Sequence, residues 1–216
     1  MNSTVDSASV RPPKARFLNA KALLWIGLLG AALWVFFSNE VALLFDYPLY
    51  HSYRLTMIQD RWLLIPHALL GTVAFILGPI QFSSRLRQRN LGLHRILGRL
   101  YVVAVYLAAM MAMAISWHRE IFPGTCVQAC TWILTTTLAW ITAKNGHVAV
   151  HRQWVARSYA VTFTFVSLRL LSIWPRYWNL SDAANVEVII ATTLGSVLTA
   201  DIIFNWREFT TRRNRS

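Results

Sequence analysis

The chain alternates between long apolar stretches and shorter polar ones. A helix that crosses the hydrocarbon core of a bilayer needs about 20 mostly apolar residues. Six segments meet this requirement, at residues 20–38, 62–82, 100–117, 126–144, 158–175 and 185–205. None of them alternates with a period of two, so helices are the remaining way to satisfy backbone hydrogen bonds in lipid. The pattern predicts an all-α fold, a polytopic transmembrane bundle of about six spanning helices.

The polar stretches divide the chain around one transmembrane domain, predicted to cover residues 20–206. Residues 1–19 are polar and predict a disordered cytoplasmic tail, and residues 207–216 predict a basic one. The longest connection, residues 39–61, is rich in aromatic side chains and suits the level of the lipid headgroups. Because no small-residue cleavage site follows the first apolar run, we expect a retained anchor and not a signal peptide.

The basic residues predict the orientation of the bundle. Of the 21 Lys and Arg residues, 16 lie in the N-terminal tail, loops 83–99 and 144–157, and the C-terminal end. The opposite loops hold four, and Arg169 lies inside a helix. Since cytoplasmic loops carry an excess of Lys and Arg, both termini are expected in the cytoplasm. The predicted location is the bacterial cytoplasmic (inner) membrane, with several passes.

Composition narrows the classes of protein. Charged residues make up 14% of the chain, against roughly a quarter in soluble domains. The net charge is +12, but the basic residues lie between apolar runs and not together on a soluble face. We therefore expect lipid and no nucleic acid as the partner. Two cysteines exclude a disulfide-rich scaffold. The sequence lacks a P-loop, a nucleophile elbow, HExxH and GxGxxG, which argues against a soluble-type enzyme and leaves a redox role open.

Two polar residues inside the apolar segments predict an intramembrane site. Arg169 lies about ten residues into the fifth segment, where a charge costs at least ~2.5–3.5 kcal/mol and normally faces the bundle interior. His67 lies at a similar depth in the second segment, on one face with Gly71, Ala74 and Gly78. The pair predicts a polar ligand site in the outer half. The alternative is a structural cluster, with Arg169 partly extended towards the outer surface.

Two similar stretches stand before apolar segments, "LGLHRILGRLY" at residues 91–101 and "VAVHRQWVARSY" at residues 148–159. Their charged positions are His94, Arg95 and Arg99 in the first and His151, Arg152 and Arg157 in the second. They could bind an anionic small molecule or a lipid headgroup. They could also hold haem b, with His94 and His151 as axial metal ligands and arginines on the propionates. The third interpretation is a positive band whose arginines extend to lipid phosphates.

A stretch of Met, His and Cys residues and the single carboxylate Asp201 give weaker indications of chemistry. The stretch "MMAMAISWHREIFPGTCVQAC" gathers soft ligands that suit Cu(I), although we favour gap-filling Met and inert Cys in apolar packing. Its candidate ligands are Met110, Met111, Met113, His118, Cys126 and Cys130. Asp201, near the cytoplasmic end of the last segment, is either a proton acceptor or the partner of a nearby arginine. We favour the arginine partner.

The stretches "HALLGTVAFILGPIQFSSRLRQRNLGLHRILGRLY" and "HRQWVARSYAVTFTFVSLRLL" resemble the Domain of Unknown Function 2306 family of bacterial predicted membrane proteins. The resemblance covers roughly residues 62–175, and its most specific piece is HRxxGRxY. The matching positions are His67, Gln81, His94, Arg95, Gly98, Arg99, Tyr101, His151, Arg152, Trp154, Arg157, Tyr159 and Arg169. Val155 stands where the family typically has methionine. The resemblance implies a multi-helix membrane protein without an established activity or cofactor.

These observations lead to three hypotheses of function. The first is a ligand-binding or transport-type membrane protein with an intramembrane polar site. The second is a transmembrane electron-transfer protein that binds haem b. The third is a non-catalytic scaffold or assembly factor whose polar clusters are structural.

Overall fold

The computed structural model describes residues 20–35, 37, 58–171 and 174–210. These residues fold as helices without a strand, which confirms the predicted all-α class. The longer helices are α1 (Ala20–Val35), α3 (Arg61–Gln81), α5 (Leu91–Ser116), α6 (Phe122–Lys144), α7 (Val148–Leu171) and α8 (Asp182–Thr210). The shorter ones are η3 (Ile58–Asp60), α4 (Ser84–Arg89) and η4 (Pro175–Asn179). The predicted tail 1–19, most of loop 39–61 and residues 211–216 lie outside the described residues.

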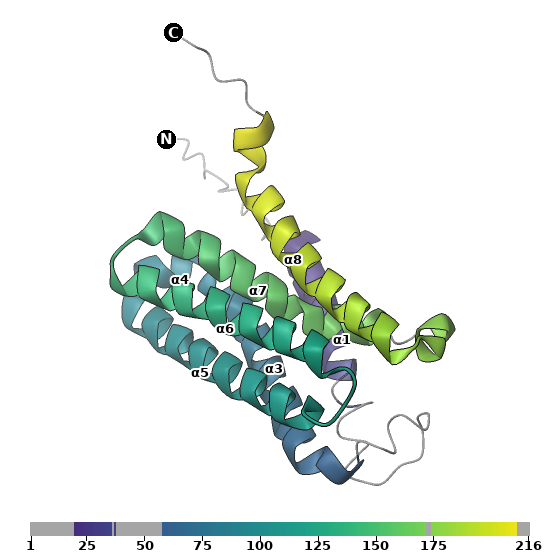
Figure 1. Cartoon of the computed structure of the whole chain (residues 1–216). Helices are drawn as coiled ribbons and strands as arrows, with labels where there is room; N and C mark the ends of the chain where they lie inside the picture. Colours follow the sequence, from purple (N-terminus) through teal and green to yellow (C-terminus); the bar gives the residue numbers. More distant parts are fainter. Residues whose placement is uncertain (1–19, 36, 38–57, 172–173, 211–216) are drawn as a thin grey trace, which may run out of the picture.

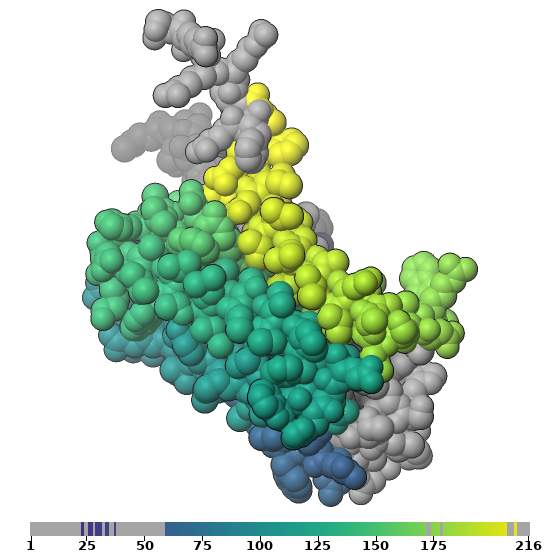
Figure 2. All heavy atoms as spheres, in the orientation of Figure 1, coloured from purple at the N-terminus to yellow at the C-terminus, as the bar shows by residue number. Residues whose placement is uncertain are grey.

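Helices α3, α5, α6 and α7 form the body of the bundle, and successive members run in opposite directions (Figure 1). α3 packs mainly on α5, while α6 packs on both α5 and α7. α8 packs on α6 and α7, and its C-terminal part stands clear of the body (Figure 2). Loop 82–90, turn 145–147 and the end of α8 therefore lie at one end of the bundle, here called the arginine-rich end. Turn 117–121, the start of α3 and the start of α8 lie at the opposite end.

Local signals explain where the helices at the arginine-rich end begin. Asn90 starts α5, because its side-chain oxygen accepts the backbone N–H of Leu93 at 2.9 Å. Ser83 caps α4 in the same way, through the N–H of Leu86 at 3.2 Å. Gly146 has φ of 74°, a left-handed conformation that suits glycine, and it separates α6 from α7. α5 and α7 therefore begin about ten residues before the predicted apolar segments 100–117 and 158–175.

Small side chains build the core and bring the helices close together. Ala68, Ala74 and Ala108 are fully buried, and Phe75 and Val105 are buried larger side chains of the core. Two glycines of α3 accept aromatic rings of α7. A β-carbon on Gly71 would lie 3.5 Å from Cδ2 of Phe165, and one on Gly78 would overlap the ring of Tyr159. The predicted small-residue face of α3 is therefore a helix–helix contact, as is common in membrane bundles.

The outer surface is unusually apolar. Trp62, Ile203 and Leu198 are 71%, 70% and 62% exposed, and exposed leucines also cover α5. Soluble monomers rarely expose contiguous apolar patches beyond a few hundred Å². Within the described residues, four helices are long and apolar enough to cross a membrane, namely α3, α5, α6 and α8. Spans at 20–38 and 158–175 stay predictions, because α1, described over 16 residues, and α7 are not among these four helices.

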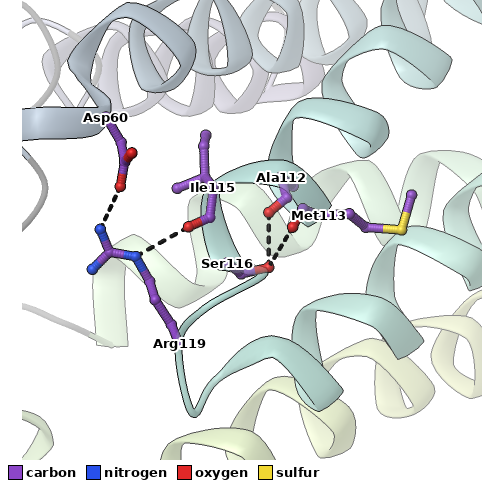
Figure 3. Close-up of polar contacts among 6 residues, drawn as sticks. All are labelled: Asp60, Ala112, Met113, Ile115, Ser116 and Arg119. Atoms are coloured by element: carbon purple, nitrogen blue, oxygen red, sulfur yellow. Dashed lines mark hydrogen bonds and ion pairs between the residues drawn. The ribbon is translucent and has the colours of Figure 1, made fainter.

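Two ion pairs connect distant parts of the chain. At the opposite end, Arg119 binds the carboxylate of Asp60 and also donates to the carbonyl of Ile115 (Figure 3). Near the arginine-rich end, Nε of Arg157 donates to Oδ1 of Asp201 at 2.7 Å. The prediction that Asp201 pairs with a nearby arginine is confirmed. This ion pair ties the protruding half of α8 to α7.

Candidate functional site

A cavity near the opposite end lies between α3, α5, α6 and α7 and has a volume of about 100 Å³. Residues Gly71, Ala109, Ala112, Ala129 and Val161 supply much of its apolar wall. Its polar wall consists of His67, Thr125, Gln128, Trp132, Thr162, Thr164 and Arg169. We call it the Arg169 cavity. The structure therefore places His67 and Arg169, the two residues predicted for an intramembrane site, in one wall.

His67 has a fixed ring orientation. Its Nδ1 lies 2.8 Å from the carbonyl oxygen of Ala108 on α5. Since a carbonyl only accepts, Nδ1 carries the proton in this contact. The proline one position earlier, Pro66, lies in the first turns of α3 and does not interrupt the helix. The small residue Gly71, one turn further, leaves space beside the ring of Phe165.

Gln128 and Trp132 are cavity residues that the sequence patterns did not single out. Nε2 of Gln128 donates to Oγ1 of Thr164 at 2.7 Å, which connects α6 to α7. Nε1 of Trp132 donates to Oγ1 of Thr162 at 2.9 Å. An amide in an apolar helix is a detectable signal, so Gln128 could have been found. Trp132 could not, because tryptophan recurs throughout this chain as an interfacial residue.

The chemistry of the Arg169 cavity is that of a small anion-accepting space. Arg169 is the only charged side chain among the described residues of its wall. The indole of Trp132 and the hydroxyls of the wall threonines already donate within the protein, and alanines and glycine keep the rest of the wall apolar. Such a mixture fits a small ligand with acceptor oxygens at one end and an apolar body at the other.

A cluster of hydroxyl groups lies next to this cavity, towards the middle of the bundle. The hydroxyl of Tyr101 is 2.8 Å from Oγ of Ser158 and 2.8 Å from Oγ1 of Thr162. Ser158 is also 2.7 Å from Oγ1 of Thr136. Ser158 is fully buried, and the others are buried to within a few per cent. The hydroxyl cluster thus joins α5, α6 and α7 through satisfied buried polar groups.

At the arginine-rich end, the structure brings His94 and His151 together around a second and much smaller space. This recess has a volume of about 10 Å³ and is lined by Gln81, Phe82, Arg87, His94, His151, Arg152 and Val155. Nδ1 of His151 donates to the carbonyl of Ala139 at 2.8 Å. We call this space the histidine recess. It shares no lining residue with the Arg169 cavity.

The haem hypothesis requires a much larger space than this recess has. Pockets for cofactors and drug-sized ligands have volumes of about 300–1,000 Å³, whereas the recess admits roughly one oxygen-sized atom. The donor set does contain two imidazoles from different helices, as axial ligation needs. The space between them does not fit a porphyrin in this arrangement, and haem binding stays a prediction.

The other predicted arginines lie outside both spaces. Arg95 and Arg99 are exposed on α5. Arg157 pairs with Asp201, and its guanidinium carbon lies 4.3 Å from the ring centre of Trp154. The positive-band interpretation therefore suits Arg95 and Arg99, whereas Arg157 has a structural partner.

The soft-ligand stretch does not come together as a metal centre. Sγ of Cys126 lies 4.0 Å from Sγ of Cys130, one turn apart on α6. Met113 packs against the core, and the ring of His118 contacts Trp117. The part of the chain that the structure describes contains no group of three or more His, Cys, Asp or Glu residues placed to hold a metal ion. The copper hypothesis gains no support from this geometry.

Fold, surface and cavities together define a helical membrane protein with polar sites inside and at one end of its bundle. A family model described as predicted membrane protein (DUF2306) matches residues 64–204. The chain belongs to this family, as the sequence motifs predicted. No curated protein and no solved structure gives a significant match.

Proposed function

We propose that the protein binds a small anionic ligand in the Arg169 cavity and acts as a ligand-binding or transport-type protein of the bacterial inner membrane. The observation that carries this proposal is the meeting of His67 and Arg169 in one cavity wall, although 102 positions separate them in the sequence. A charged side chain that faces an internal cavity of a membrane helix marks substrate and ion pathways.

The volume and wall of the cavity support a short amphipathic anion as the ligand class. An apolar cavity of about 150 Å³ is known to hold benzene, so about 100 Å³ suits a ligand of similar or smaller size. The guanidinium of Arg169 matches a carboxylate in geometry and charge. Gln128 and Thr125 add neutral hydrogen-bonding groups, and the alanines accept a short hydrocarbon.

Replacing Arg169 tests this proposal. Charge-assisted hydrogen bonds contribute about 1.5–3 kcal/mol, so Arg169→Ala is expected to weaken carboxylate binding by roughly 10- to 100-fold. The measurement is titration of the purified protein in detergent with acetate, butyrate and benzoate, followed by thermal stability. The neutral amide of each acid serves as the matched probe. Arg169→Lys keeps the charge but loses the forked pair of donors. Its carboxylate affinity is expected to lie between those of the wild type and Arg169→Ala.

Arg176→Ala is the matched control, because Arg176 is exposed in η4 near the same end and does not line the cavity. It should bind carboxylates as the wild type does. Equal binding of acids and amides, or an unchanged affinity in Arg169→Ala, would show that this cavity is not an anion site. The scaffold interpretation would then be preferred.

The proposal includes a topology of six spans with both termini in the cytoplasm. Reporter fusions after residues 90 and 150, both at the arginine-rich end, are expected to give the cytoplasmic signal. The reason is the 16 to four distribution of Lys and Arg, which favours the cytoplasm for that end. A fusion after residue 120, in the turn between α5 and α6, should give the periplasmic signal. A periplasmic signal after residue 90 or 150 would contradict this orientation.

A further inference from the structure

We propose that the histidine recess is a binding site for a phosphate group, separate from the Arg169 cavity and independent of the function proposed for it. Three helices and the α4 segment contribute to this recess: Gln81 from α3, Arg87 from α4, His94 from α5, and His151 with Arg152 from α7. The sequence distance between these elements shows that the tertiary fold assembles the site.

Two buried polar atoms of the recess lack an internal partner. Nε2 of Gln81 and Nδ1 of His94 are buried and make no hydrogen bond to the described residues. An unsatisfied buried polar group is costly, at about the strength of a lost hydrogen bond. A bound oxygen that accepts from Nε2 of Gln81 and from the protonated Nδ1 of His94 satisfies both atoms at once. The amide nitrogen of Gln81 can only donate, so the bound atom must accept.

The histidines are positioned for such a role. Because Nδ1 of His151 donates to the carbonyl of Ala139 at 2.8 Å, its ring orientation is set and Nε2 is its other contact atom. His94 and His151 are close enough to interact electrostatically. Gly98, one turn after His94, leaves room for Gln81, since a β-carbon there would lie 3.3 Å from Oε1 of Gln81.

The charge around the recess selects an anion over a metal cation. Arg87 and Arg152 are lining residues, and none of the lining residues is a carboxylate. Among the described ion pairs, the acids Asp60 and Asp201 bind Arg119 and Arg157 and not these two arginines. Arg152 also lies over the ring of Phe204, at 5.9 Å from its centre. Two guanidinium groups disfavour a cation by repulsion and match the paired oxygens of a phosphate.

The size of the recess defines how the phosphate binds. A volume of about 10 Å³ admits one oxygen atom. One phosphate oxygen enters between Gln81 and His94, and the remaining oxygens stay at the mouth with Arg87 and Arg152. This chemistry is shared by free phosphate and by the headgroup of an anionic lipid. Phe82, which lines the recess and is 43% exposed, offers an apolar surface for acyl chains.

The test measures binding of three probes to the full chain in detergent: inorganic phosphate, dihexanoylphosphatidic acid and dihexanoylglycerol, which lacks the phosphate. The double variant Arg87→Gln/Arg152→Gln is expected to weaken phosphatidic acid binding at least tenfold. Its matched control, Arg85→Gln/Arg89→Gln, removes two exposed arginines of the same α4 segment that do not line the recess. The control is expected to bind within threefold of the wild type. His94→Ala, which leaves the total arginine charge unchanged, is expected to lose affinity as well.

The outcomes separate the two sources of phosphate. Binding of phosphatidic acid with little binding of inorganic phosphate supports a lipid headgroup, and comparable binding of both supports free phosphate. Three results would overturn the site: equal binding of dihexanoylglycerol, equal weakening in the Arg85/Arg89 control, or no binding of either phosphate probe. Arg169 does not line the recess. Unchanged phosphate binding in Arg169→Ala would therefore show that the recess binds phosphate independently of the Arg169 cavity.

Discussion

Gly78→Ala is expected to destabilise the bundle strongly. A β-carbon at residue 78 would overlap Cδ2 and Cε2 of Tyr159, which are part of a rigid ring. The ring cannot move aside freely, because it is 8% exposed and also packs against Phe75 and Phe82. Overpacking costs about 1–3 kcal/mol, and occasionally more. We expect the free energy of unfolding to fall by about 3 kcal/mol or more. The measurement is the fall in the thermal midpoint of the purified protein in detergent.

Two further variants make this expectation specific. Gly195→Ala changes the same residue type in α8, where a β-carbon would meet no atom within 4 Å. This variant should leave the free energy of unfolding unchanged or raise it by up to about 1 kcal/mol, because alanine has the higher helix propensity. Tyr159→Ala should remove most of the penalty of Gly78→Ala, so that the double variant is little worse than Tyr159→Ala alone. Additive effects of the two substitutions would mean that the ring contact is not the cause.

Ser158→Ala is expected to be the second most damaging of these changes, although it removes a single oxygen. Ser158 is fully buried and has the hydroxyls of Tyr101 and Thr136 as partners, at 2.8 and 2.7 Å. Leaving a buried donor or acceptor unsatisfied costs about 1–3 kcal/mol in soluble proteins. Hydrogen bonds between membrane helices average about 0.6 kcal/mol, with a maximum near 1.7. We therefore expect a loss of about 1–2 kcal/mol in unfolding free energy.

A double-mutant cycle with Tyr101→Phe identifies the cause. If the two hydroxyls act as a unit, the double variant should lose at least 0.5 kcal/mol less than the sum of the single losses, as roughly expected for contacting residues. Ser167→Ala is the control, because Ser167 is half-buried and its hydroxyl donates to the carbonyl of Phe163 within its own helix. Its effect should stay within about 0.5 kcal/mol. Independent effects of Ser158→Ala and Tyr101→Phe would contradict the cluster.

The helical class and two residues of the Arg169 cavity were accessible to sequence reasoning. Arg169 was recognisable because a charge in an apolar helix is costly. His67 was recognisable from its place above Gly71 and Gly78 on one face. Helix boundaries were less accessible. Counting apolar residues predicts only the part of a helix that lies in hydrocarbon. α5 and α7 begin earlier, with more polar turns that this count leaves out. The cap that starts α5 is Asn90.

Which arginine pairs with Asp201, and which residues lie opposite each other on different helices, could not be read from the sequence. The sequence motifs grouped Arg157 with Arg152, but Arg157 pairs with Asp201, 44 positions away, and Arg152 lines the histidine recess. Spacing along one helix carries no information about which side chain of another helix lies opposite. For the same reason, the sequence used Arg87 only as one of the charges that predict orientation. The packing of α4 on α5 places it in the same recess as His94.

The hydroxyl cluster has a consequence for the electrical insulation of the membrane. It lies between the two polar spaces, since Tyr101 and Ser158 each stand seven residues, or about 10 Å of helix rise, beyond His94 and His151. Thr162, the member next to the Arg169 cavity, donates its proton to the backbone carbonyl of Ser158 at 3.0 Å. A backbone carbonyl cannot pass a proton on, so this chain of hydroxyls ends there. In this arrangement of the helices, the hydroxyl cluster therefore gives a proton no continuous path between the two polar spaces.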